Sequence, residues 1–224
     1  MPRKFVIERQ PDHFSCGPTC LHAVYRHWGS DESFEEVLAS TGRLEDGGTL
    51  AVLLGSHALG RGFRAELISF NLQLFDPTWL RGRDEGWIAA RLVQQAAVKD
   101  DPKLQLASDA YARFLRLGGR LSMEDLSTAL FARYLKAGVP LLAGVSATYL
   151  YQCSREQADG TADDVGGQPQ GHFVVLADMR DGEVLVADPW PEAPHYDWVP
   201  VERLVTAILL GVLTYDGNLL AISR

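Results

Sequence analysis

The chain has 224 residues, of which 46% are hydrophobic and 22% are charged, and its formal net charge is −8 at pH 7. Such a chain is long enough to bury a core, and its acidic balance argues against binding to nucleic acid or to an anionic membrane surface. Three cysteines do not make a disulfide framework. The opening residues lack the apolar run of a signal peptide, and no apolar stretch is long enough to span a bilayer. We therefore expect a cytoplasmic protein with free thiols.

The first half of the sequence predicts mostly helices. Leu21, Val24, Tyr25 and Trp28 recur at steps of three and four residues, which indicates an amphipathic helix over residues 16–28. The remaining elements expected here are a short strand at 4–9, helices at 33–42 and 48–62, a strand at 63–69, and mostly helix over 77–137, clearest at 122–138.

The second half of the sequence changes to the pattern of strands. "HFVVLADM" and "EVLVADPW" flank "RDG", which is a strong signal for a β-hairpin. The other expected elements are a buried strand at 139–147, extended chain at 148–153, a polar loop at 154–171, a helix at 200–212 and a strand at 218–223. Helices followed by antiparallel strands predict an α+β fold.

The stretch "QPDHFSCGPTC", residues 10–20, groups the side chains expected around a nucleophilic cysteine. Cys16 opens a helix, where unpaired backbone N–H groups and the helix dipole favour a thiolate. Pro18 suits the first helical turn, because the N–H that it lacks has no partner there. Gly17 leaves space beside the sulfur for a substrate carbonyl. The pattern predicts a reactive thiol at Cys16.

A nucleophilic thiol needs a base, and His172 is placed for that role at the start of a strand. Folding the hairpin around Asp181-Gly182 brings residues 172 and 173 opposite residues 188 and 189. Asp188 then lies beside His172, where a carboxylate holds the tautomer of the imidazole. The amide of Gln10, together with the backbone N–H of Cys16, is expected to bind the oxyanion of a tetrahedral intermediate.

These motifs together resemble a known family. "Q-x5-C-G-P" over 10–18, "GHFVVL" over 171–176 and "ADP" over 187–189 are similar to the bacteriocin-processing, double-glycine-leader peptidases, a branch of the papain-like cysteine peptidases. The resemblance covers roughly residues 1–30 and 139–190. It implies a papain-like fold in which glutamine lines the oxyanion hole, cysteine attacks, histidine is the base and aspartate orients it. The matching residues are Gln10, Cys16, His172 and Asp188.

Other cysteines and histidines have simpler interpretations. Cys20 lies one helical turn beyond Cys16 and is expected in the core. The histidines expected on the surface or in satisfied structural positions are His22, His27 and His57, whereas His13 is close enough in sequence to line the site. A zinc site formed by Cys16, Cys20, His13 and His22 is disfavoured, because structural zinc sites usually combine two separate pairs of ligands and Cys153 is the only other cysteine.

The sequence thus predicts one papain-like α+β domain over residues 1–224, with an additional helical insertion at about 75–137. A helix with the cysteine at its amino end packs on an antiparallel sheet that carries the histidine and aspartate. The predicted function is a cysteine peptidase or amidase with a peptide or amide substrate, without metal, cofactor, nucleic acid or membrane, and the oligomeric state stays open. The alternatives are an amide-transferring acyltransferase of the same fold and a catalytically silent peptide-binding domain.

Overall fold

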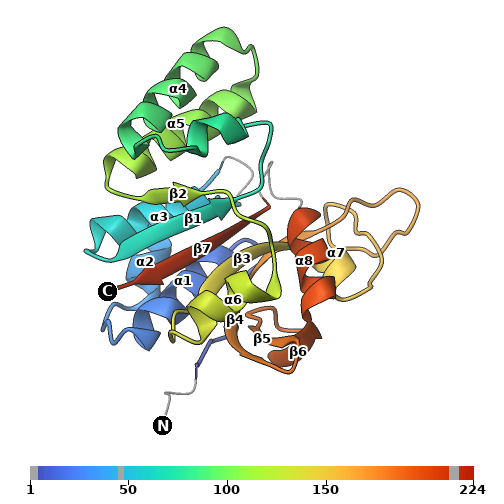
Figure 1. The fold of residues 1–224 in the computed structure, drawn as a ribbon. Helices are drawn as coiled ribbons and strands as arrows, with labels where there is room; N and C mark the ends of the chain where they lie inside the picture. Colours follow the sequence, from blue (N-terminus) through green and yellow to red (C-terminus); the bar gives the residue numbers. More distant parts are fainter. Residues whose placement is uncertain (1–4, 45–47, 212–216) are drawn as a thin grey trace.

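A computed structural model describes residues 5–44, 48–211 and 217–224, and Figure 1 shows helices on both sides of a seven-stranded sheet. The helices are α1 (Cys16–His27), α2 (Phe34–Ser40), α3 (Ala51–Gly60), α4 (Glu85–Val98), α5 (Pro102–Arg116), α6 (Thr128–Leu135), α7 (Ala147–Leu150) and α8 (Val201–Leu209), with a 3-10 turn η1 (Pro77–Leu80). The strands are β1 (Arg64–Ser69), β2 (Arg120–Ser122), β3 (Leu141–Ser146), β4 (Gly171–Arg180), β5 (Glu183–Ala187), β6 (Tyr196–Pro200) and β7 (Asn218–Ser223).

The sheet joins the two halves of the sequence through the last strand. Its order is β2-β1-β7-β3-β4-β5-β6, and every pairing is antiparallel except that of β1 with β2. β7 therefore lies between β1 from the first half and β3 from the second. The α+β class predicted from the sequence is confirmed.

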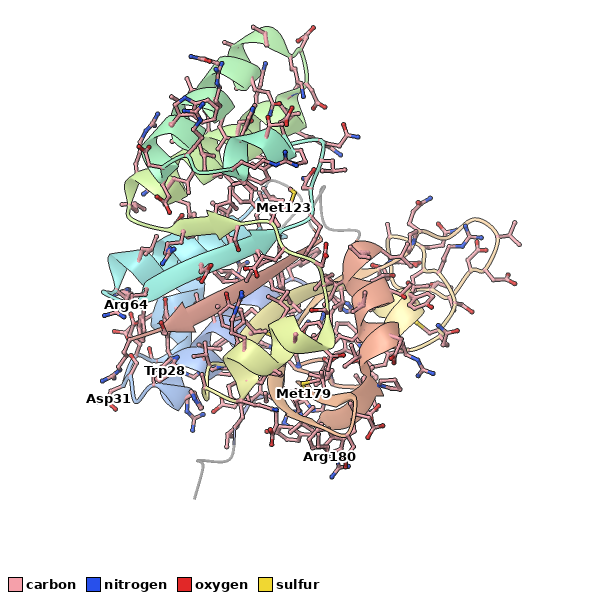
Figure 2. The ribbon with its side chains drawn as sticks, viewed as in Figure 1. Trp28, Asp31, Arg64, Met123, Met179 and Arg180 are labelled. Atoms are coloured by element: carbon pink, nitrogen blue, oxygen red, sulfur yellow. The ribbon has the colours of Figure 1, made fainter. Side chains whose placement is uncertain are left out.

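Two apolar clusters fill the space between the sheet and its helices. The larger includes α1, α3 and α5 with Phe173 and Val175 of β4, and the other includes α6 and α8 with Val174 and Leu176. Alternate residues of β4 thus face opposite sides of the sheet, as the pleat of a strand requires. Figure 2 labels Met179 and Arg180, the last two residues of β4, and His172 lies near the other end of this strand. No helix among the described residues is both long enough and apolar enough to pass through a bilayer.

Gly17 fixes how closely α1 approaches the sheet. A Cβ atom at this position would lie 2.5 Å from Cγ2 of Thr49 and 3.3 Å from Cδ2 of Phe173. Phe173 directly precedes Val174 in β4 and follows His172, so this contact fixes the amino end of α1 beside the start of β4. The absent side chain of Gly17 therefore serves packing, and the expectation that it leaves space for substrate is wrong.

The hairpin of β4 and β5 contains a β-bulge. Asp178 pairs with Leu185 near the turn, whereas Val175 pairs with Ala187 further along, so Ala177 is an extra residue in the ladder. Ala177 packs against the same cluster as Val175, whereas Met179 packs against the other cluster, which agrees with a shift of one residue between Leu176 and Asp178.

The bulge decides which face of the sheet Asp188 occupies. One step beyond the last pair, Asp188 falls opposite Val174, which shares its face with His172. Without the bulge Asp188 would fall opposite Val175 and point to the other face. The predicted pairing of residues 172 and 173 with 188 and 189 is wrong, because the turn pairs Arg180 with Glu183, and this register places Asp188 two residues along β4 from His172 even with the bulge. His172 and Asp188 are instead diagonal neighbours.

The helical segment between β1 and β2 forms a hairpin of α4 and α5 next to β2 (Figure 1). Asp101 caps α5 through the backbone N–H groups of Lys103 and Leu104, and Pro102 occupies the first helical position. Tyr111 and Phe114 of α5 are fully buried, and the Tyr111 ring contacts Phe75 edge-on at 5.0 Å. The insertion predicted at about 75–137 thus contributes β2 and α6 as well as the helical hairpin.

Four predicted elements differ in the structure. Residues 5–9 form no strand, and residue 4 lies outside the described residues. The helix predicted from 122 begins at Thr128, because Ser127 rather than Ser122 caps it and residues 120–122 join the sheet as β2. Residues 147–150 form α7 instead of extended chain, because the Ser146 side chain accepts a hydrogen bond from the Tyr149 N–H. Of the helix predicted at 200–212, α8 covers Val201–Leu209, and residue 212 is not among those described.

Candidate active site

Cys16 is the first residue of α1, as the sequence predicts, and it is 9% exposed. The capping residue Ser15 makes no side-chain hydrogen bond to the helix start. The Ser15 hydroxyl instead donates a hydrogen bond to the Asp12 carbonyl, and the Thr19 hydroxyl donates one to the Ser15 carbonyl. The backbone N–H groups of the first turn are therefore not capped by Ser15 and face the space around the sulfur.

His172 and Asp188 form a buried hydrogen-bonded pair. Nε2 of His172 lies 2.8 Å from Oδ1 of Asp188, and the two residues are 6% and 0% exposed. The Cys16 side chain interacts with the same imidazole, and because Nε2 is engaged with Asp188, Nδ1 is the nitrogen available to the thiol. The structure thus brings together three of the four predicted site residues, although more than 150 positions separate Cys16 from His172.

The electrostatics of this pair favour a charged imidazole next to a charged carboxylate. Burial alone would lower the pKa of His172, but hydrogen bonds to Asp188 and Cys16 outweigh burial and raise the pKa well above its ordinary value. Burial alone would raise the pKa of Asp188, but the hydrogen bond and charge of His172 lower it. A protonated His172 beside Asp188 is suited to stabilise a neighbouring thiolate.

Two further groups hold the Asp188 carboxylate. The backbone N–H of Trp190 donates to Oδ1 at 2.6 Å, and the hydroxyl of Tyr151 donates to Oδ2. The Trp190 ring lies edge-on to the His172 ring, with centroids 6.3 Å apart. The sequence prediction missed Tyr151, and no local signal identifies it, because the segment was expected to be extended.

Gln10 lies next to the site but bonds to the backbone. Its N–H donates to the Pro189 carbonyl at 2.8 Å, and its Nε2 donates to the Asp12 carbonyl at 2.7 Å. The side chain is 4% exposed, and its Oε1 has no hydrogen-bond partner among the described residues. One hydrogen of the Gln10 side-chain amide is thus bound to the Asp12 carbonyl, and the second could be donated to an oxyanion. The oxyanion role of Gln10 stays a prediction.

Cys20 is a core residue. It is fully buried, and its thiol donates to the Phe173 carbonyl at 3.3 Å. Burial, with the nearby charges of Cys16 and Asp188, raises the pKa of this thiol well above its ordinary value. Cys20 is therefore unsuited to nucleophilic attack.

His57 belongs to a separate hydrogen-bond chain. Its Nδ1 lies 2.8 Å from the Tyr25 hydroxyl and its Nε2 lies 2.8 Å from Oγ of Ser40, which also donates to the Glu36 carbonyl. Burial keeps the pKa of Tyr25 high, so its hydroxyl donates to Nδ1 and Nε2–H donates to Ser40. Because each polar hydrogen in this series of hydrogen bonds already has an acceptor, we interpret the arrangement around His57 as structural, as expected from the sequence.

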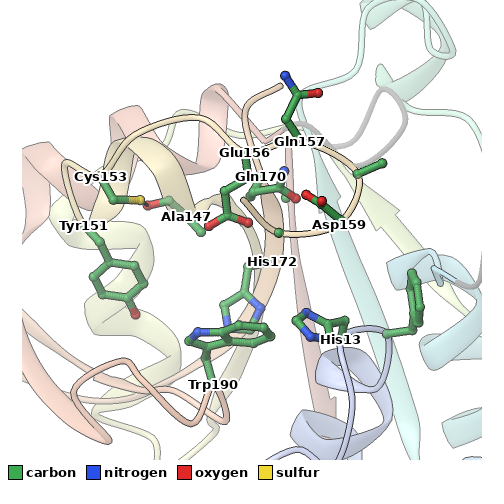
Figure 3. Close-up of a pocket in the computed structure, with 14 residues that line it drawn as sticks. His13, Ala147, Tyr151, Cys153, Glu156, Gln157, Asp159, Gln170, His172 and Trp190 are labelled. Carbon is green, nitrogen blue, oxygen red and sulfur yellow. Dashed lines mark hydrogen bonds between the residues drawn. The ribbon is translucent and has the colours of Figure 1, made fainter. Parts of the chain in front are cut away.

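Beside His172 lies a cavity of about 470 Å³ (Figure 3). Tyr151 and Cys153 line it on one side of His172 and His13 lines it on the other, with Trp190 below. The loop over residues 156–160 forms a further wall, and it is held by backbone hydrogen bonds between Glu156 and Gln168. The cavity is large enough for a few residues of a peptide.

Within residues 5–44, 48–211 and 217–224, no three histidine, cysteine, aspartate or glutamate side chains gather closely enough to hold a metal ion. His22, one of the zinc ligands considered from the sequence, instead bonds through Nε2 to the Glu32 carbonyl at 3.2 Å.

The element order and the sheet define a papain-like α+β fold, which a comparison with solved structures supports. A C39-like peptidase from Bacillus anthracis covers 99% of this chain and 95% of its own, with a TM-score of 0.52 and 13% identity. The peptidase domain of Streptococcus ComA, a bi-functional ABC transporter involved in quorum sensing, gives a TM-score of 0.48, with 14% identity and 99% coverage of both chains. A double glycine motif protease from an AMS/PCAT transporter, in complex with its leader peptide, gives 0.48, with 13% identity and coverage of 99% and 92%. No family model and no curated protein matches the sequence.

Proposed function

We propose that this protein is a cysteine peptidase that hydrolyses a peptide or amide bond through a thioester on Cys16. The observation that carries the proposal is the continuous contact from Cys16 through His172 to Asp188, next to a cavity that would accept a peptide. The sequence resemblance to double-glycine-leader peptidases and the fold similarity to a C39-like peptidase both support it. We also propose that the chain belongs with that branch of papain-like peptidases.

In the first half of the reaction, His172 holds the proton of the Cys16 thiol and the thiolate attacks the substrate carbonyl carbon. A carbon–sulfur bond forms and the carbonyl electrons move to oxygen. When the tetrahedral intermediate collapses, the carbon–nitrogen bond breaks and protonated His172 gives its proton to the leaving nitrogen. An amine leaves and the acyl group remains on Cys16 as a thioester.

The oxyanion that forms in this step needs fixed donors. The uncapped N–H of Cys16 at the start of α1 is one of them, and the free hydrogen of the Gln10 amide is the other. Each such donor contributes roughly 3–4 kcal/mol when it is aimed at the developing charge. In the second half, neutral His172 takes a proton from water and hydroxide attacks the thioester carbon. The carbon–sulfur bond then breaks, the carboxylic acid product leaves, and the Cys16 thiolate is restored beside protonated His172.

The proposal is tested by the reactivity of the three thiols towards iodoacetamide at neutral pH, read by peptide mass spectrometry. We expect alkylation of Cys16 to be faster than that of Cys153, although Cys153 is exposed and Cys16 is buried. Cys16→Ala should remove this fast phase and all peptidase activity, whereas Cys153→Ala, a change in the cavity wall, should keep the fast phase. Fast labelling of Cys153 with an inert Cys16 would sink the proposal.

The two alternatives differ in their products. A peptide-binding domain would bind peptides without turnover and would leave Cys16 unreactive. An acyltransferase would form a new amide when an amine is added, whereas a peptidase forms the carboxylic acid in water alone. Mass analysis of products with and without an added amine distinguishes them.

A further inference from the structure

Tyr151 occupies a position that connects the cavity to the buried carboxylate. It follows α7, a single helical turn that begins directly after β3, and β3 pairs with β4 so that Val145 lies opposite His172. The Tyr151 ring lines the cavity beside His172 (Figure 3), while its hydroxyl bonds to Asp188. The short helix therefore places this side chain against the pair from the side of the substrate cavity.

The hydrogen bonds of Asp188 are divided unequally between its two oxygens. Oδ1 accepts from Nε2 of His172 at 2.8 Å and from the Trp190 N–H at 2.6 Å. Oδ2 accepts only from the Tyr151 hydroxyl among the described residues. Because Asp188 is 0% exposed, water cannot replace that donor without a change in the surrounding structure.

The direction of this hydrogen bond follows from the charges. Burial, with the negative charge of Asp188, raises the pKa of Tyr151 far above its ordinary value, so the phenol keeps its proton. The ionised carboxylate has no proton to give and can only accept. The Tyr151 hydroxyl is therefore the donor, and Oδ2 depends on it.

We propose that Tyr151 is a positioning residue, whose hydroxyl fixes the rotation of the Asp188 carboxylate so that Oδ1 faces His172. This role rests on the proposed peptidase function and acts through Asp188 rather than on the substrate. Without the hydroxyl, Oδ2 is left unpaired in a buried site, and the carboxyl group rotates to share the donors of Oδ1. The His172 imidazole then loses part of its hydrogen bond and turns more freely relative to Cys16.

Tyr151→Phe is the direct test, because it removes the hydroxyl and keeps the ring. We expect the pKa of His172, followed by NMR of its ring, to fall towards its ordinary value, since the hydrogen bond to Asp188 helps to raise it. Alkylation of Cys16 by iodoacetamide at neutral pH should slow by about tenfold, the size of effect expected for one hydrogen bond to a buried charge. Tyr149→Phe is the matched control, because the Tyr149 hydroxyl bonds to none of the described residues; it should change neither quantity.

A double-mutant cycle shows whether Tyr151 acts through the carboxylate. Asp188→Asn should lower the pKa of His172 and the alkylation rate, and adding Tyr151→Phe should change the rate by less than twofold. Equal slowing in both backgrounds, or a pKa of His172 that stays unchanged or rises in Tyr151→Phe, would overturn the positioning role. If the pKa falls as expected but Cys16 of the unchanged protein is inert, the peptidase proposal fails while the role of Tyr151 in holding Asp188 stands.

Discussion

Gly17 illustrates how single residues determine the geometry around the sulfur. It lies between Cys16 and Pro18 in the first turn of α1, and its hydrogen faces Thr49, Leu54 and Phe173 at contact distance. Any side chain here would push the start of α1 away from β4. Since His172 is next to Phe173, the same displacement would separate the Cys16 thiol from the His172 imidazole.

Gly17→Ala is therefore expected to damage both stability and reactivity. Its Cβ would lie 2.5 Å from Cγ2 of Thr49, so either the threonine or the helix must move. We expect a loss of roughly 1–3 kcal/mol in the free energy of unfolding, typical of overpacking, measured by denaturant titration. Alkylation of Cys16 should slow in the same protein. Gly60→Ala is the control, because its Cβ would meet no atom within 4 Å; an equal loss there would contradict the explanation.

At this scale the sequence predicts part of the site. Cys16, His172 and Asp188 are recognisable because a helix start and a hairpin are local patterns, and the structure brings these residues together. Tyr151 is not recognisable, because its contact with Asp188 spans 37 positions and depends on the short helix α7. The hydrogen bond from Gln10 to the Asp12 carbonyl depends likewise on loop geometry.

At the scale of elements, the loop between α7 and β4 shapes the cavity. The Glu156 N–H donates to the Gln168 carbonyl and the Gln168 N–H donates to the Glu156 carbonyl, so the two ends of the loop are held together. Gly167 lies inside this closure, where a Cβ would approach the Asp163 carbonyl oxygen to 2.4 Å and the Glu156 nitrogen to 2.8 Å. The loop therefore depends on a glycine at this position to form the cavity wall.

Gly167→Ala should affect substrate binding more than thiol chemistry. The added methyl group clashes with backbone, so residues 156–160 must shift and the cavity changes shape. We expect KM for a peptide substrate to rise several-fold, while the alkylation rate of Cys16 by the small reagent iodoacetamide stays unchanged. The neighbouring change Gly166→Ala meets side-chain ends of Asp163 and Gln157 rather than backbone, and should raise KM less. Equal rises in KM for both variants would refute this role of the loop.

At the scale of the whole molecule, the segment before α1 connects the helix that carries Cys16 to the part of the chain around Asp188. The Ile7 N–H donates to the Tyr196 hydroxyl at 3.1 Å, and the Ile7 carbonyl lies 2.9 Å from Nε2 of His195. Nδ1 of His195 contacts the Asp188 carbonyl at 3.0 Å. This segment was predicted as a strand, yet it binds the loop after Asp188 mainly through side chains, a pattern that alternation of apolar residues cannot reveal.

The pair of His172 and Asp188 should make the stability of the whole protein depend on pH. The pKa of Asp188 is lowered, so its contribution is present above the unfolded value and is lost as the pH falls through the folded value. The pKa of His172 is raised, so its contribution is present below the unfolded value and is lost as the pH rises through the folded one. Asp188→Asn should therefore lower Tm most between these limits and flatten both limbs of the profile, measured by calorimetry. A profile lowered evenly at every pH would contradict this linkage.

The order of the sheet lay beyond prediction from sequence. The last strand was expected at 218–223, and β7 occupies Asn218–Ser223, yet its place between β1 and β3 is set by long-range packing. The three-residue strand β2 is too short for alternation to indicate it. Strands and helices with strong local patterns could be predicted, whereas their neighbours in space could not.

Because of the bulge at Ala177, whether Asp188 and His172 lie on the same face of the sheet depends on whether the number of residues between them is odd or even. Sixteen positions separate them, and an insertion or deletion of one residue in the hairpin would turn the carboxylate away from the imidazole unless the bulge were gained or lost at the same time. A change of two residues would keep the carboxylate on the same face of the sheet as the imidazole. A change of an odd number of residues in this hairpin is therefore expected to keep the contact between His172 and Asp188 only where the bulge changes with it.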